Sequence, residues 1–69
     1  MKNKLEELRT KLDWTQQDLA DRVRVSRQTI ISLENGRYNP SINLAFRLAR
    51  LFQVRIEDLF LYSEDEDNG

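Results

Sequence analysis

Residues 25–39 combine side chains that can read DNA bases with the signals of a short helix. Ser26 stands where a helix N-cap is expected, and Arg27 and Gln28 follow it directly. Arginine can donate two hydrogen bonds to guanine, and glutamine can pair in the same bidentate way with adenine. Two interpretations follow: Arg27 and Gln28 read a base sequence, or they occupy the solvent side of a small helical bundle.

Arginine is concentrated around this segment. The whole chain has a net charge of −1, but four of its twelve acidic residues stand together at 64–67. Without that run, eleven Lys and Arg residues face eight acidic ones. Four arginines fall between positions 22 and 37, where the only acid is Glu34. Such clustering is typical of a surface that faces phosphates, and a solvated helix face is the alternative explanation.

The composition excludes several kinds of chemistry. The chain has 69 residues, no cysteine and no histidine, so disulfides, thiolate metal sites and the commonest general base are missing. We therefore expect a single domain that is not an enzyme and that needs no cofactor, metal or small-molecule ligand. No apolar run reaches the roughly 20 residues of a membrane span, and the N-terminus lacks the apolar core of a signal peptide. A cytoplasmic protein without membrane contact is expected.

Hydrophobic periodicity predicts an all-α fold of five helices. Leu5, Leu8 and Leu12 recur at helical spacing in the first, and hydroxyl residues at the N-cap position begin the next three. The acidic end of the chain has nothing to bury, so we expect a disordered tail at 63–69. The expected helices are 2–12, 16–23, about 27–34, a fourth one that begins after Ser41, and about 56–61.

The second and third helices are joined by only two or three residues. So short a turn prevents an antiparallel arrangement, and the two helices must cross steeply, as in a helix-turn-helix. In that arrangement the second helix presents its N-terminal residues to the major groove of DNA. The N-terminal ends of these helices, at Thr15-Gln16 and Ser26-Arg27, can also donate hydrogen bonds to phosphate oxygens, because their N–H groups point outward.

Three motifs, "WTQQDLADRV", "VSRQTIISLENGRYNPS" and "IEDLF", together resemble the Cro/C1-type (XRE) helix-turn-helix transcriptional regulators. The resemblance covers about residues 5–60 and is greatest to the short, stand-alone prokaryotic members. It implies a compact lambda-repressor-like DNA-binding domain at 1–62, with the helix-turn-helix motif at about 16–35. The implied function is sequence-specific binding of double-stranded DNA, with repression of transcription as the expected outcome.

The resemblance also implies which residues touch DNA. Serine can bond to more than one base, Ile31 can contact a thymine methyl, and Arg27 has phosphate binding as an alternative role. Gln17 and Thr29 have a solvent-exposed helix position as their alternative. The expected base contacts are Arg27, Gln28, Ile31 and Ser32. The expected backbone contacts are Thr15, Gln16, Gln17, Ser26, Thr29, Asn35, Arg37, Tyr38 and Asn39.

Other matched positions have structural roles in this family. Arg9 and Glu34 are expected to form an ion pair between the first and third helices. Arg24 and Gln53 stand where the family usually has glycine, and a positive φ there would cost each residue about 1 kcal/mol of strain. Trp14 is interpreted as a lid on the core rather than a DNA contact.

Leu59, Phe60, Leu61 and Tyr62 form a run of four large apolar residues, more than one short helix face can bury. We expect part of this run to form a homodimer interface, because one such domain contacts few bases and a two-fold dimer reads two half-sites. The alternative is that all four close the core of the monomer. The alternative function is a helical protein-interaction module, such as an antitoxin-like partner binder.

Overall fold

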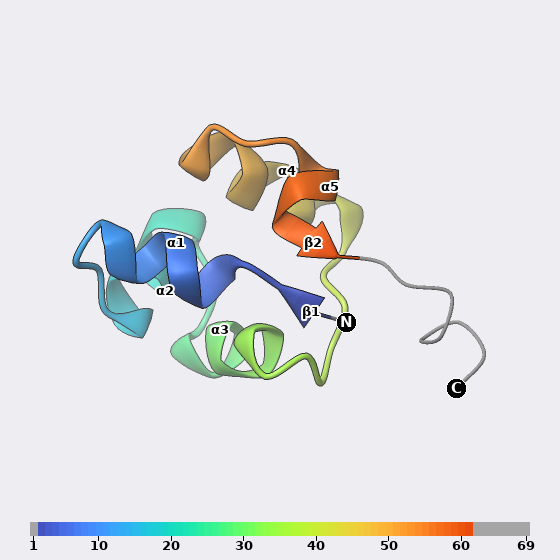
Figure 1. Cartoon of the computed structure of the whole chain (residues 1–69). Coiled ribbons are helices and arrows are strands. Elements are labelled where there is room, and N and C mark those ends of the chain that lie inside the picture. Colours follow the sequence, from blue (N-terminus) through green and yellow to red (C-terminus); the bar gives the residue numbers. More distant parts are fainter. Residues whose placement is uncertain (1, 62–69) are drawn as a thin grey trace.

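The computed structural model of the chain describes residues 2–61, which form a helical domain with one pair of short strands (Figure 1). Two residues at each end of this range pair as antiparallel strands. The predicted all-α class of five helices is confirmed, with the strand pair as an addition. The elements are β1 (Lys2–Asn3), α1 (Leu5–Lys11), α2 (Gln16–Val23), α3 (Arg27–Glu34), α4 (Ile42–Phe52), α5 (Ile56–Leu59) and β2 (Phe60–Leu61).

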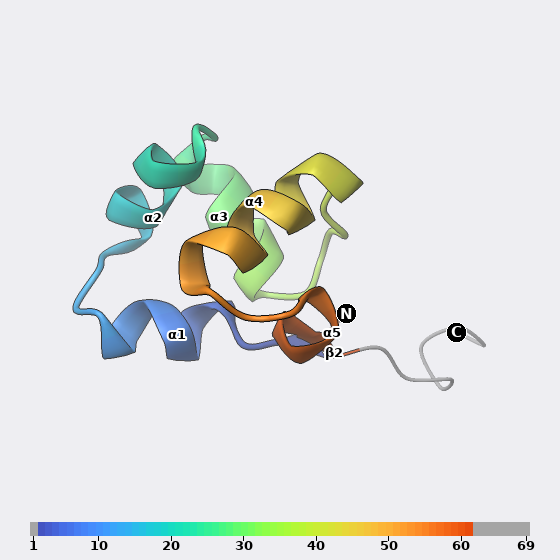
Figure 2. The same cartoon turned by 90° about the horizontal axis from the view of Figure 1, so that it is seen from above.

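The helices surround one apolar core. In Figure 1, α3 lies along the lower edge of the molecule and α4 and α5 lie above it, and the view from above has α4 crossing over α3 (Figure 2). Burying a large aliphatic side chain contributes roughly 1.5–3 kcal/mol. None of the helices between residues 2 and 61 has the length and apolar character needed to cross a bilayer. The completely buried large side chains are Leu5, Leu19, Ile30, Leu33, Leu48 and Leu59.

Three helices begin at a hydroxyl N-cap, as their sequences predict. In each, the cap oxygen accepts a hydrogen bond from the backbone N–H three residues later. Thr15 forms a complete capping box with Asp18, since the Asp18 carboxylate also accepts a bond from the Thr15 N–H. The three bonds are Asp18 N to Thr15 Oγ1 at 3.0 Å, Thr29 N to Ser26 Oγ at 3.2 Å and Leu44 N to Ser41 Oγ at 3.2 Å.

The first helix begins later than predicted. It was expected from residue 2, but α1 starts at Leu5, because the Asn3 side chain accepts a bond from the Leu5 N–H at 3.0 Å. The Lys4 N–H donates to the carbonyl of Leu59 at 2.9 Å. These two bonds hold the N-terminal segment extended against β2, where Asn3 pairs with Phe60.

Two helices also end earlier than predicted. The fifth was expected to reach residue 61 but stops at Leu59, and Phe60 is extended with φ −111° and ψ 116°. The first ends at Lys11, so Leu12, expected on its buried face, is 49% exposed. Phe60 leaves the helix because it pairs with β1, and the chain turns after α1 at Asp13, which has a positive φ. Hydrophobic periodicity indicates neither feature.

Arg24 and Gln53 keep the glycine-like backbone expected of their positions. Their φ angles are 61° and 56°, in the left-handed region, and Asp13 adopts the same conformation with φ 59°. At Arg24 this geometry lets the Val25 N–H donate to the Ala20 carbonyl at 3.0 Å and so end α2. The chain can therefore turn sharply between α2 and α3 without glycine.

Candidate nucleic-acid interface

The helix pair α2 and α3 has the geometry of a helix-turn-helix. α2 ends at Val23, residues 24–26 form the turn, and α3 begins at Arg27 with Ser26 as its extended cap. Both helices have the bounds that the sequence predicts. Because α3 lies along the outside of the molecule in Figure 1, one of its faces is open to solvent.

The first turn of α3 exposes two donor-rich side chains. Arg27 and Gln28 are both exposed, and neither makes a hydrogen bond or ion pair within residues 2–61. Further along the same helix, Ile30 and Leu33 are completely buried and fix it to the core. The outward pair is therefore available to a ligand in front of α3.

The other expected contacts on α2 and α3 are half-buried or already bonded within the fold. Ile31 and Ser32 are half-buried one turn further along α3. The Ser26 and Thr29 hydroxyls share a hydrogen bond of 3.0 Å at the helix start. Gln17 Nε2 donates to Asp21 Oδ1 at 2.8 Å. Like the Thr15 hydroxyl in its capping box, these side chains already have structural partners.

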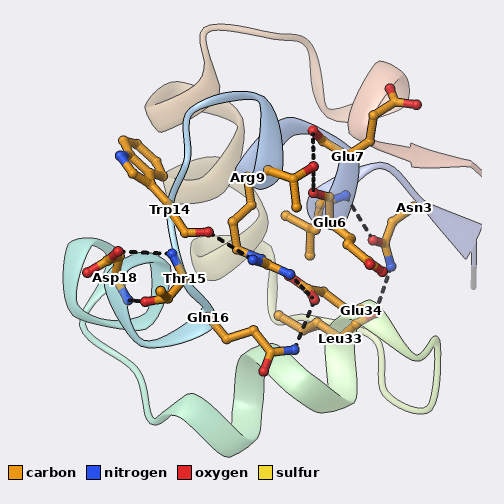
Figure 3. Close-up of polar contacts among 12 residues, drawn as sticks. Asn3, Glu6, Glu7, Arg9, Trp14, Thr15, Gln16, Asp18, Leu33 and Glu34 are labelled. Atoms are coloured by element: carbon orange, nitrogen blue, oxygen red, sulfur yellow. Dashed lines mark hydrogen bonds and ion pairs between the residues drawn. The ribbon is translucent and has the colours of Figure 1, made fainter.

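The far end of α3 is fixed by a buried ion pair (Figure 3). Arg9 reaches from α1 with two parallel bonds, from Nε to Glu34 Oε2 at 2.8 Å and from Nη2 to Oε1 at 3.2 Å. The two side chains are 12% and 3% exposed. The hydrogen bond to Glu34 raises the pKa of Arg9 above its ordinary value, so the guanidinium stays charged. The ion pair implied by the family resemblance is present.

Two further groups complete this anchor. The Arg9 Nη1 donates to the Trp14 carbonyl at 2.8 Å, and Gln16 Nε2 donates to Glu34 Oε1 at 3.1 Å. Glu34 thus links α1, α2 and α3 (Figure 3). Gln16, expected to hold a DNA phosphate, has this structural bond as well, and its amide has a second N–H with which to meet phosphate.

Asn3 is a positioning residue that the sequence prediction missed. Its Nδ2 donates to the Leu33 carbonyl at 2.7 Å, while its Oδ1 accepts a bond from the Leu5 N–H at the start of α1 (Figure 3). The side chain therefore links β1 and the start of α1 to the last turn of α3. No local signal indicates this link, because its bond to Leu33 joins residues 30 positions apart.

Residues 35–39, here called the clamp segment, connect α3 to α4. The Arg37 N–H donates to the Ser32 carbonyl at 3.1 Å, and Gly36 takes φ 71°, so the segment turns immediately after α3. This turn places donor side chains between the end of α3 and the Ser41 cap of α4. The expected backbone contacts of the segment, Asn35, Arg37, Tyr38 and Asn39, are all exposed.

Two arginines, Arg22 and Arg47, have structural contacts within the fold. The Arg22 guanidinium lies 4.1 Å from the ring centroid of Trp14, and Trp14 packs against Phe52 with 5.8 Å between ring centroids. Trp14 is therefore a half-buried lid on the core, as its interpretation from sequence proposes. Arg47 Nη1 donates to the Val23 carbonyl at 2.7 Å and so satisfies the end of α2.

The four apolar residues expected at the dimer interface, 59–62, do not all lie on the surface. Leu59 and Phe60 are core residues of the monomer, 0% and 8% exposed, and belong to the same buried apolar cluster as Leu5. The expectation that these two contribute to a subunit interface is therefore corrected. Leu61 is 39% exposed, and Tyr62 lies outside the described residues.

The second helix of the pair begins with exposed arginine and glutamine, and its far end is fixed to the fold. In helix-turn-helix proteins, the second helix is the one that inserts into the major groove. The fold and this surface define a helix-turn-helix DNA-binding protein. The family profile described as helix-turn-helix matches residues 5–59. Together with the relatives described below, this match shows that the chain belongs to the Cro/C1-type (XRE) helix-turn-helix transcriptional regulators, which are not enzymes.

Known proteins of similar sequence or structure agree with this assignment. An uncharacterized HTH-type transcriptional regulator of Methanocaldococcus jannaschii is 54% identical over 66 residues, which cover 96% of this chain and all of that protein. A competence pilus inhibition repressor of Acinetobacter baylyi is 39% identical over 61 residues, or 88% of this chain and 56% of that protein. The crystal structure of a hypothetical transcription factor, NHTF, from Neisseria has the same fold, with TM-score 0.74, 20% identity and coverage of 93% of this chain and 72% of that one.

Proposed function

We propose that the protein is a transcriptional repressor that binds a two-fold DNA operator as a homodimer, with α3 in the major groove. The observation that carries this proposal is the open first turn of α3, where Arg27 and Gln28 are exposed beside a firmly anchored helix. Repression is supported by the relative in Acinetobacter baylyi whose name describes a repressor.

The proposed base contacts come from α3. Arg27 would donate to guanine O6 and N7, and Gln28 would pair with adenine through its amide, each contributing roughly 1–3 kcal/mol of discrimination. Ile31 and Ser32 are half-buried, so they reach only bases that approach α3 closely. Their proposed partners are a thymine methyl for Ile31 and a base edge for Ser32.

The proposed backbone contacts fix the register of the protein on DNA without reading its sequence. The clamp segment contributes Arg37 as a cation and Tyr38 as a hydroxyl, both exposed. The remaining contacts lie in the clamp segment and at the two helix starts, where N–H groups of the first turn can meet phosphate. They are Thr15, Gln16 and Gln17 on α2, Ser26 and Thr29 on α3, and Asn35 and Asn39 in the clamp segment.

The homodimer is proposed to use the exposed apolar surface around Ile42 and Leu61 rather than the buried Leu59. Ile42, on the first turn of α4, is 73% exposed, and Leu61 of β2 is 39% exposed. An apolar hollow of about 160 Å³ also lies beside Ile42. A second copy would cover this apolar surface. The hollow is lined by Asn39, Pro40, Ile42, Ala45, Ile56 and Phe60.

Sedimentation velocity tests the dimer directly. The wild-type chain is expected to be dimeric at tens of micromolar, and Ile42→Glu is expected to be a folded monomer, because a buried unpaired carboxylate disfavours association. Phe46→Glu is the matched control, since Phe46 is 51% exposed on α4 but does not line the hollow. A wild-type monomer, or equal effects of both variants, would remove Ile42 from the interface.

The salt dependence of binding to a labelled duplex of arbitrary sequence tests DNA binding itself. Affinity should fall by about 0.9 log units per log unit of salt for each phosphate contacted. Arg37→Ala is expected to reduce that slope by about 1 for every sequence, because it removes one phosphate contact. If no duplex binds at about 50 mM salt, the helical protein-interaction module replaces DNA binding as the proposed function.

A further inference from the structure

Charge is strongly separated along this chain. Between residues 22 and 56 there are seven arginines and one acid, Glu34, which is paired with Arg9. After residue 56 there are six acids and no Lys or Arg, and four of the acids are consecutive at 64–67. The two parts attract each other electrostatically wherever the fold brings them near.

The acidic run begins close to the clamp segment. Phe60 lines the same hollow as Asn39 and Pro40, and both views have β2 ending beside the connection from α3 to α4 (Figures 1 and 2). An extended residue spans at most about 3.6 Å, so position 64, three residues after Leu61, lies within about 11 Å of the end of β2. The run can therefore reach the clamp segment without any change in the fold.

The clamp segment can receive this charge. Arg37 and Arg27 are exposed, and neither side chain has an ion-pair partner among residues 2–61. The nearest acid in sequence to Arg37 is Glu34, whose side chain is 3% exposed and bonded to Arg9 and Gln16. The nearest acid to Arg27 is Asp21, whose carboxylate accepts a bond from Gln17. The exposed surface of the clamp segment is consequently positive and uncompensated.

We propose that residues 62–69, here called the acidic segment, occupy the clamp segment and the first turn of α3 when no DNA is bound. This inference rests on the proposed function, because the acidic segment and DNA phosphates would compete for Arg27 and Arg37. The carboxylates of 64–67 take the place of phosphates. Their displacement lowers the affinity for every duplex by the same factor, which keeps a larger fraction of the protein off random DNA.

A DNA-binding experiment tests the competition with two variants of equal charge. Neutralising the acidic segment with E64Q/D65N/E66Q/D67N is expected to tighten binding to an arbitrary duplex about 10-fold at about 50 mM salt, because a few exposed ion pairs are lost. The advantage should shrink toward about 200 mM salt, since exposed charges are screened. The control variant removes four exposed acids elsewhere: E6Q/E7Q/D13N/D58N.

The control separates docking from net charge. A gain of about 2-fold or less in the control, beside the larger gain in the acidic-segment variant, supports docking, because distant exposed charges are largely screened. Equal gains in both variants would overturn it, since only the overall charge would then matter.

An NMR comparison without DNA tests directly whether the acidic segment contacts the clamp segment and the first turn of α3. The amide and guanidinium resonances of Arg27 and residues 35–39 are expected to shift between the wild-type chain and the acidic-segment variant. Shifts confined to residues 2–4 and 57–61, or no shifts, would overturn the proposal. The NMR measurement contains no DNA, so it tests docking independently of DNA binding. If neither protein binds any duplex, the proposed function is contradicted, but the NMR result on docking is unaffected.

Discussion

The two ends of α3 are held in opposite ways. At its C-terminal end, Glu34 is almost completely buried and accepts bonds from Arg9 and Gln16. At its N-terminal end, Arg27 and Gln28 are exposed and make no hydrogen bond or ion pair within the described part of the chain. The fold thus fixes the direction of the helix at one end and leaves the other end to a ligand.

This difference separates stability from recognition. A site that must read bases needs a helix held in one orientation, since binding is weakened when the supporting element has to be ordered at the same time. The anchor supplies that orientation from three other elements, α1, α2 and β1. Changes at the anchored end should therefore alter unfolding, whereas changes at the open end should alter DNA binding alone.

Removing Arg9 should give the largest effect on stability. Arg9→Met leaves the charge of Glu34 buried without its partner, and such a loss costs about 3–5 kcal/mol. Chemical denaturation of the two proteins measures the difference in free energy of unfolding. The double variant R9M/E34L is the matched control and should recover most of the loss, because an apolar pair of similar size replaces the ion pair.

A loss in Arg9→Met of less than about 1 kcal/mol, the value of an exposed ion pair, would mean that this end of α3 is not anchored by the pair. The contrast between the two ends would then lose its physical basis.

A smaller effect is expected at the turn that connects α2 to α3. Arg24 has φ 61°, where a residue with Cβ is strained by about 1 kcal/mol and glycine is not. Arg24→Gly should therefore be more stable than Arg24→Ala by about that amount, although both lack the arginine side chain. Thermal unfolding of the two variants checks this, and equal midpoints would indicate that the turn relaxes out of the left-handed conformation.

The smallest effect concerns the capping box of α2. The backbone N–H of Thr15, and then its hydroxyl, lower the pKa of Asp18 below its ordinary value of 3.8. A carboxyl whose folded pKa is depressed adds stability above its unfolded pKa, and that stability is lost as the pH falls through the folded pKa. Wild-type unfolding midpoints should therefore fall more steeply than those of Asp18→Asn below about pH 4. Parallel curves would contradict a titrating cap.

Local signals explain why α2 and α3 were predicted so well. Each begins at a hydroxyl cap and has its apolar residues at helical spacing, and the turn between them is too short for any other arrangement. These features lie within a few residues of one another, so the sequence contains them directly. The open first turn of α3 follows partly from the same pattern, because Gln28 falls opposite the buried Ile30 and Leu33, and Arg27 is the first residue of the helix.

Long-range pairing explains what was missed. The strands pair Asn3 with Phe60, and segments of two residues are too short to show the alternation that predicts a strand. Without that pairing, Leu59 and Phe60 resemble an uncovered apolar run rather than part of the core. The bond from Gln16 to Glu34 likewise depends on how α2 and α3 cross, which sequence spacing does not specify.

Selection of bound duplexes from a random pool, with the wild-type chain and Gln28→Ala in parallel, tests the reading role of the open end most directly. The wild-type chain should enrich two symmetric half-sites about 10–10.5 base pairs apart, the spacing of one DNA turn. Gln28→Ala should lose preference at one base pair of each half-site and keep the rest. No enriched sequence, or the same sequence profile from both proteins, would contradict base reading by Gln28 on α3.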